Sequence, residues 1–148
     1  MPSTHVSLHF HVVFSTKERR EFIADPWRER LHAYLGGTVR ALGGIAEAVG
    51  GTRDHVHMLL SLRATHCLSD VMREVKGPSS EWMHTELKER EFAWQEGYGA
   101  FTVSPNRVQA VKHYIATQEE HHRKRTFQEE YLEFLKEGGV EYDERYLW

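Results

Sequence analysis

The sequence predicts an α+β fold in which four antiparallel strands form one ferredoxin-like sheet. Two observations support this prediction. Short segments alternate apolar and polar side chains, whereas longer segments repeat apolar side chains at helical spacing. These segments follow one another in the order strand, helix, strand, strand, helix, strand, helix, which matches a split βαβ arrangement with an additional helix.

The predicted strands are short and are bounded by turn residues. Four segments have the alternation or the compact apolar run of a strand: residues 5–15, 45–49, 55–62 and 99–103. The glycine-rich residues 50–53 separate the second strand from the third, so these two are expected to form a hairpin. Because each strand has one apolar face, the helices are expected to pack on one face of the sheet.

Helical spacing of apolar side chains marks four other segments: residues 25–42, 69–87, 104–121 and 127–136. Asp25 is expected to cap the first of these helices, with Pro26 at its first helical position. Pro78 interrupts the second helix, so a kink or a break is expected near Gly77.

The composition is ordinary for a single globular domain. The chain has 148 residues, of which 40% are hydrophobic and 28% are charged. No apolar run is long enough to span a membrane, and the first residues lack the pattern of a secretory signal. The single cysteine, Cys67, excludes an internal disulfide framework and a multi-cysteine zinc site. We therefore expect a cytoplasmic protein with no membrane partner.

The charge is distributed unevenly along the chain. Residues 126–148 carry seven acidic and two basic side chains, so this segment has a charge of −5 within a total of −3. The remaining residues therefore sum to +2, and two basic clusters lie among them, at residues 17–20 and 123–125. This pattern is compatible with a phosphate-bearing partner but does not require one.

Two histidines share one face of the third predicted strand. Side chains alternate along a strand, so His55 and His57 lie on the face opposite the apolar side chains. Two neighbouring imidazoles on a rigid strand are a natural pair of metal ligands, although polar residues on a wet face are the alternative. His9 and His11 have the same spacing on the first strand, and spacing alone cannot choose between the pairs.

A tyrosine and a glutamine share one face of the helix predicted at residues 104–121. Tyr114 and Gln118 are four residues apart, so their side chains are neighbours on the helix surface. They lie beside the apolar stripe, at the edge where the helix meets the body of the protein. A boundary tyrosine next to a solvated glutamine is the alternative interpretation.

Together these patterns resemble the single-tyrosine HUH transposases, the insertion-sequence-200-like group. The resemblance depends on four motifs in this order: Lys17-x-Arg19-Arg20, Asp54-His55-Val56-His57-Met58-Leu59-Leu60, Trp94-Gln95-x-Gly97-Tyr98-Gly99-Ala100-Phe101, and Tyr114-Ile115-x-x-Gln118 followed by His121-His122. No single motif is specific, but their order and spacing are. The resemblance implies a transposase domain at residues 1–125 and a separate C-terminal helix and acidic aromatic tail at residues 126–148.

The resemblance also implies residue roles. His55, His57 and Gln118 would bind a divalent ion, Mg²⁺ or Mn²⁺, and Tyr114 would be the nucleophile that forms a 5′-phosphotyrosine link with single-stranded DNA. The tyrosine-bearing helix would lie over the histidine face. The family acts as a homodimer, recognises DNA hairpins near the ends of its element and needs no nucleotide cofactor. Its members would be cytoplasmic and nucleoid-associated.

The chemistry of the residues suits these roles. An ion held by neutral imidazole and amide ligands keeps its full positive charge for the oxygens of a phosphodiester. Imidazole ligands favour Mn²⁺ or another transition ion over Mg²⁺, but they do not decide the question. Tyrosine, with a pKa near 10, needs a base or a nearby cation to become a good nucleophile.

Other residues are weaker candidates for contacts with DNA. Five basic side chains are predicted to contact phosphates, with plain surface charge as the alternative: Lys17, Arg19, Arg20, Arg73 and Lys76. Trp94 and Tyr98 are candidates for stacking on unpaired bases. Phe101 is better explained by core packing.

Two other functions remain open from the sequence. A domesticated or regulatory DNA-binding relative would keep the fold but no longer transpose. A small-molecule hydrolase with a His-x-His metal site fits poorly, because such barrels are longer and need further ligands on later strands.

Overall fold

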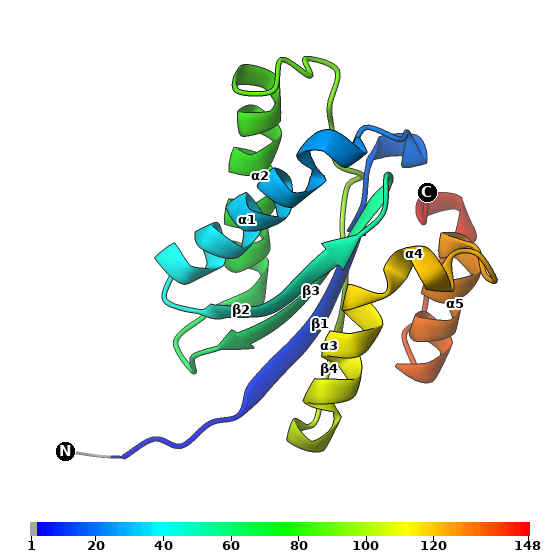
Figure 1. Ribbon diagram of the computed structural model, residues 1–148. Coiled ribbons are helices and arrows are strands. Elements are labelled where there is room, and N and C mark those ends of the chain that lie inside the picture. The colour runs from blue at the N-terminus through cyan, green and yellow to red at the C-terminus, as the bar shows by residue number, and fades with distance from the viewer. Residues whose placement is uncertain (1–2) are drawn as a thin grey trace.

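The computed structural model describes residues 3–148 (Figure 1). Its centre is a four-stranded antiparallel sheet with the spatial order β2-β3-β1-β4. The strands are β1 (Leu8–Ser15), β2 (Ile45–Gly51), β3 (His55–Leu62) and β4 (Gly99–Thr102). The predicted α+β, ferredoxin-like sheet is therefore confirmed, and both strands with a histidine pair occupy its central positions.

Two long helices, α1 (Asp25–Ala41) and α2 (Leu68–Thr85), pack on one face of the sheet (Figure 1). The main hydrophobic core lies between them and the strands. Its strand side chains alternate along the sequence as predicted, and they include Val12, Phe14, Val56, Met58 and Leu60. Burying each such side chain contributes about 1.5–3 kcal/mol, so this face provides most of the stability of the domain.

The opposite face carries the histidines and is covered by α3 (Val108–Ala116), α4 (Gln118–His121) and α5 (Phe127–Glu137) (Figure 1). A smaller core of Leu59, Val108 and Ile115 joins α3 to the sheet. Phe134 of α5 stacks on Phe101 of β4, with 5.6 Å between ring centroids. The tyrosine-bearing helix thus covers the histidine face, and the C-terminal helix covers it as well.

Three short 3₁₀ helices complete the described secondary structure: Lys17–Arg19, Pro105–Arg107 and Glu144–Tyr146. Within residues 3–148, no helix has both the length and the apolar character needed to cross a membrane.

Several predicted boundaries differ from the structure. The break expected near Gly77 is absent, because α2 continues through Pro78 as one helix. Asp25 is the first residue of α1 rather than its cap, and its side chain makes no capping hydrogen bond. The single helix predicted at residues 104–121 is divided at Thr117, whose φ of −112° and ψ of 30° are not helical.

Candidate functional site

The histidine pair of β3 lies in the interior, between the sheet and the helices of the second face. His55 and His57 are both fully buried. Nδ1 of His57 lies 2.8 Å from Nε2 of His11 on the neighbouring strand. His9 instead pairs with Glu47 at 3.2 Å. Of the two first-strand histidines, His11 therefore supports the site, and His9 forms a separate surface pair.

Gln118 and His55 approach each other across the boundary between helix and sheet. The Oε1 atom of Gln118 lies 3.2 Å from Nε2 of His55. The amide orientation follows from its other end, where Nε2 donates to the main-chain carbonyl of Tyr114 at 3.1 Å. On the far side of the imidazole, Nδ1 of His55 donates to Oδ1 of Asp54 at 2.8 Å. The structure thus brings together two of the three predicted metal ligands with their donor atoms facing.

Tyr114 is half-buried beside the histidine pair. Its ring centroid lies 5.8 Å from that of His57 and 4.6 Å from that of His121. Burial raises the pKa of Tyr114 above its usual value near 10, and the neighbouring carboxylate of Glu130 raises it further. At neutral pH the side chain is therefore a protonated phenol.

Two other residues, His122 and Glu130, complete this cluster. Nε2 of His122 lies 3.1 Å from both Nε2 of His55 and Oε1 of Gln118. The carboxylate of Glu130, on α5, places Oε1 2.9 Å from Nε2 of His57 and Oε2 3.4 Å from Nε2 of His122. Candidate ligand atoms of His55, His122 and Glu130 all lie within 4.8 Å of one another.

Neither residue was among the ligands predicted from the sequence. His122 belongs to the last motif of the resemblance, which gives it no role as a ligand. Glu130 had a signal that was missed, because it lies three residues after Phe127 and four before Phe134, within the apolar stripe of its helix. An acidic side chain in such a stripe is buried against a partner, and Glu130 is only 4% exposed.

Burial determines the charge states of the cluster. It lowers the pKa of His57 to about 3 and that of His11 to about 4, so both imidazoles are neutral at neutral pH. Burial alone would raise the pKa of Glu130, but the polar groups of His57 and Tyr114 beside the carboxylate outweigh it and lower that pKa. The cluster therefore combines neutral imidazoles with one carboxylate.

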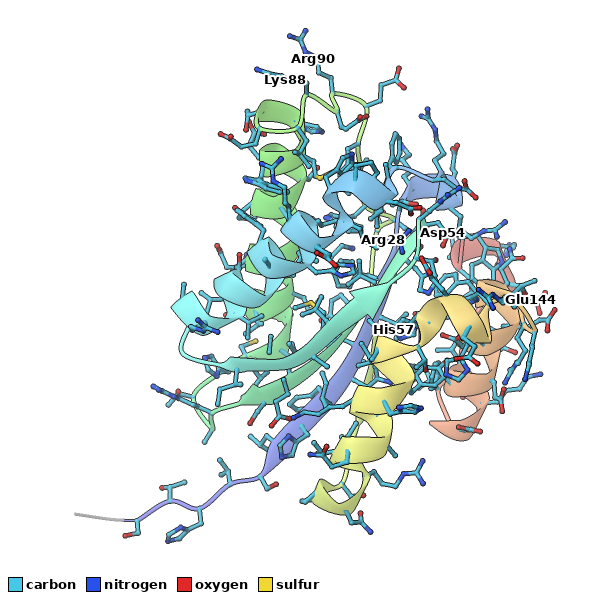
Figure 2. All side chains as sticks on the ribbon, in the orientation of Figure 1. Arg28, Asp54, His57, Lys88, Arg90 and Glu144 are labelled. Carbon is cyan, nitrogen blue, oxygen red and sulfur yellow. The ribbon has the colours of Figure 1, made fainter. Side chains whose placement is uncertain are left out.

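A cavity of about 370 Å³ opens beside His55. Four arginines line it: Arg19, Arg28, Arg53 and Arg123. Acidic side chains line it too, and Arg28 pairs with Asp25 and Glu119. Figure 2 shows Arg28 and Asp54 at this end of the sheet. The cavity gives the buried cluster a charged opening toward solvent.

The five predicted phosphate contacts fall into two groups. Lys17, Arg19 and Arg20 lie just after β1, near the cavity, and Arg20 pairs with Glu91 at 3.1 Å. The other two lie on α2, behind the sheet, and both already have partners. Nζ of Lys76 donates to the carbonyls of Gln95 and Gly97, each at 2.6 Å. Exposed Arg73 forms an ion pair with Asp70 at 3.0 Å.

The aromatic candidates also differ from one another. Trp94 is 9% exposed, and its indole nitrogen donates to Oγ of Ser79 at 2.9 Å. Phe101 packs on Phe134, as core packing predicted. Tyr98 is 36% exposed, so its ring is accessible for stacking.

The chain matches a family model described as "Transposase IS200 like" over residues 4–118. This chain belongs to that family. ISDra2 transposase TnpA of Deinococcus radiodurans is 26% identical to this transposase over 117 residues, which cover 75% of this chain and 84% of the relative. The matched family region ends at Gln118, so His122 and Glu130 lie beyond it.

Solved structures agree with this assignment. The crystal structure of a candidate transposase from Deinococcus radiodurans matches with a TM-score of 0.64 and 25% identity, covering 80% of this chain and 95% of that one. A REP-associated tyrosine transposase bound to a REP hairpin matches with a TM-score of 0.60 and 13% identity, covering 82% and 73%. The second likeness shows the shared fold.

Proposed function

We propose that this transposase cleaves and rejoins single-stranded DNA through a 5′-phosphotyrosine link at Tyr114. A divalent ion, Mg²⁺ or Mn²⁺, would be bound by His55, His57 and Gln118. One observation supports the proposal above the others. The segment that carries Tyr114 also places Gln118 3.2 Å from a histidine of the β3 pair, so nucleophile and candidate ligands share one site.

The donor atoms fit a divalent ion. Nδ1 of His55 donates a hydrogen bond to Asp54, so in the neutral ring form Nε2 has a free lone pair that faces the cluster. Gln118 likewise turns its carbonyl oxygen inward, because its amide nitrogen is used elsewhere. Nε2 of His57 is buried 2.9 Å from Oε1 of Glu130, without the geometry of a hydrogen bond. Such an ion would act as a Lewis acid on a phosphate oxygen.

The residues of the chain then account for the transfer. The Tyr114 oxygen forms a bond to phosphorus, the bond from phosphorus to the 3′ oxygen breaks, and that oxygen takes a proton to become a 3′ hydroxyl. The reverse reaction, with a 3′ hydroxyl as the attacking group, rejoins DNA and releases Tyr114. The covalent link preserves the bond energy, so no nucleotide is required. Because the pKa of Tyr114 is raised, its proton must be removed as the reaction proceeds.

The surface supports a DNA partner with hairpin ends, as does the hairpin bound by the REP-associated relative. Arg19 lines the cavity beside His55, with Lys17 and Arg20 in the same segment, and we propose that these three side chains contact the phosphate backbone. We assign Arg73 and Lys76 lesser roles, because they lie on α2 at the other face. A homodimer is part of the same proposal.

The test is covalent capture of single-stranded DNA taken from the flanks of the gene. Wild-type protein with Mn²⁺ or Mg²⁺ should give a slower-migrating adduct on a denaturing gel, and Tyr114→Phe should give none. Tyr142→Phe, in the exposed C-terminal tail, is the matched control and should form the adduct normally. An adduct from folded Tyr114→Phe, or full activity in excess chelator, would show that the proposed nucleophile or the proposed metal is wrong.

A further inference from the structure

Three side-chain atoms from separate parts of the chain converge on one point in the cluster. They are Nε2 of His55, Oε1 of Gln118 and Nε2 of His122. The three separations are 3.2, 3.1 and 3.1 Å. Polar atoms this close are normally joined by hydrogen bonds. Whether these three atoms can be joined in that way depends on which of them carries a hydrogen, and this follows from the partners at the other end of each side chain.

Those partners leave no hydrogen for the centre when both imidazoles are neutral. Nδ1 of His55 donates to the Asp54 carboxylate. Nδ1 of His122 lies 3.0 Å from the main-chain carbonyl of Arg125, which can only accept. Each neutral ring therefore presents a lone pair at Nε2. Gln118 presents a carbonyl oxygen, so the centre contains three acceptors, and a cation would be the natural occupant.

The carboxylate of Glu130 approaches the same point from α5. It is buried, with Oε2 3.4 Å from Nε2 of His122 and Oε1 2.9 Å from Nε2 of His57. Around an ion with bonds of about 2.1 Å, neighbouring donors lie roughly 3.0–3.4 Å apart. The three separations among His55, Gln118 and His122 match this spacing, and so does the 3.4 Å between His122 and Glu130.

We propose that His122 and Glu130 are additional metal ligands, which extend the cation site beyond the region shared with the family. The inference rests on the proposed function, which supplies the ion. It changes the expected chemistry, because Glu130 adds one negative charge and His122 adds a softer nitrogen donor. Three imidazoles and a carboxylate favour Mn²⁺ or a similar transition ion over Mg²⁺. The carboxylate strengthens binding and reduces the net positive charge left for a phosphate.

Binding of Mn²⁺ tests the proposal without any measurement of DNA cleavage. Full-length protein is stripped with chelator and titrated with Mn²⁺, and free Mn²⁺ is followed by its electron paramagnetic resonance signal. His122→Ala and Glu130→Gln should each weaken binding at least about tenfold, because even groups that only support metal ligands contribute that much. The matched controls are His113→Ala, exposed on α3, and Glu129→Gln, exposed on α5. Both variants should bind Mn²⁺ like wild type.

Each outcome has a definite meaning. If His55→Ala abolishes binding while folded His122→Ala and Glu130→Gln bind normally, the inference is overturned and the proposed function stands. A protonated His122 that donates to Gln118 would give this result. If wild type binds no Mn²⁺, the inference and the metal role in the proposed function both fail.

If circular dichroism shows that a variant does not fold, a second measurement on the wild type tests the same inference. In Co²⁺-loaded protein, the Nδ1–H proton of a coordinated imidazole is strongly shifted by the paramagnetic ion. A shifted Nδ1–H signal of His122, assigned through its proximity to Arg125, is expected. An unshifted His122 signal beside a shifted His55 signal would contradict the inference.

Discussion

Replacing Gly50 with alanine should push α3 away from the sheet. Gly50 lies on β2 opposite His57, and α3 crosses directly above it. A Cβ atom at this position would lie 2.4 Å from the carbonyl oxygen of Ile115 and 2.9 Å from its Cγ2. The carbonyl must therefore retreat by about 0.6 Å merely to reach 3.0 Å, a separation that is still tight.

The displacement would be transmitted to the site. Ile115 follows Tyr114 directly and precedes Gln118 by three residues, so both functional side chains move with the same backbone. Overpacking of this kind costs about 1–3 kcal/mol. For a domain of this size, 2 kcal/mol corresponds to a decrease in Tm of about 4–8 °C. A misplacement approaching 1 Å also costs up to about 100-fold in rate.

Thermal unfolding followed by circular dichroism gives the stability, and single-turnover adduct formation on single-stranded DNA gives the rate. Gly37→Ala is the matched control, because the space around Gly37 on α1 is open. It should raise stability by about 0.5–1 kcal/mol, the usual gain from replacing glycine within a helix. If Gly50→Ala melts within 1 °C of wild type, roughly the error of such a measurement, and forms the adduct at the same rate, the argument for close approach of α3 is wrong.

Two other predictions concern the orientation of a ligand and the dependence of stability on pH. Asp54→Ala should weaken Mn²⁺ binding about 10–100-fold, because the His55 ring loses the acceptor that fixes its orientation; an unchanged titration curve would contradict this. Burial, with a smaller contribution from Arg28, lowers the pKa of His32 to about 4, whereas an unfolded chain keeps the value near 6.5. The unfolded state therefore takes up the proton first, and His32 alone should lower stability by about 3 kcal/mol as the pH decreases from 6.5 to 4, in addition to the losses from buried His11 and His57. His32→Gln should remove this contribution in urea unfolding series, and an identical pH slope in both proteins would show that another group is responsible.

The strand and helix order could be predicted from the sequence because alternation and helical spacing are local patterns. The break expected at Pro78 was wrong for a tertiary reason. Val75 and Met83, on either side of it, are both buried in the main core, and this packing keeps the two halves of α2 in one continuous helix. The interruption of the helix at Thr117 could not be predicted from apolar spacing either. The Thr117 hydroxyl donates to the carbonyl of His113, and this local hydrogen bond competes with the helical pattern.

The candidate site was predictable in part. The shared face of His55 and His57 follows from strand geometry, and the proximity of Tyr114 to Gln118 follows from helix geometry. The position of α5 does not follow from either, because periodicity shows that a helix has an apolar face but not which surface it covers. His122 and Glu130 therefore emerged only when the fold placed α4 and α5 over the sheet.

The placement of α5 over the histidine face has a consequence for the order of synthesis. Ribosomes make a chain from its N-terminus at about 5–20 residues per second. The strands and the tyrosine segment are thus complete before Glu130 has been added. Until the last helix docks, the histidine face lacks the cover that Glu130 and Phe134 provide. An ion from the surroundings can therefore reach the histidines in the growing chain more freely than in the finished protein.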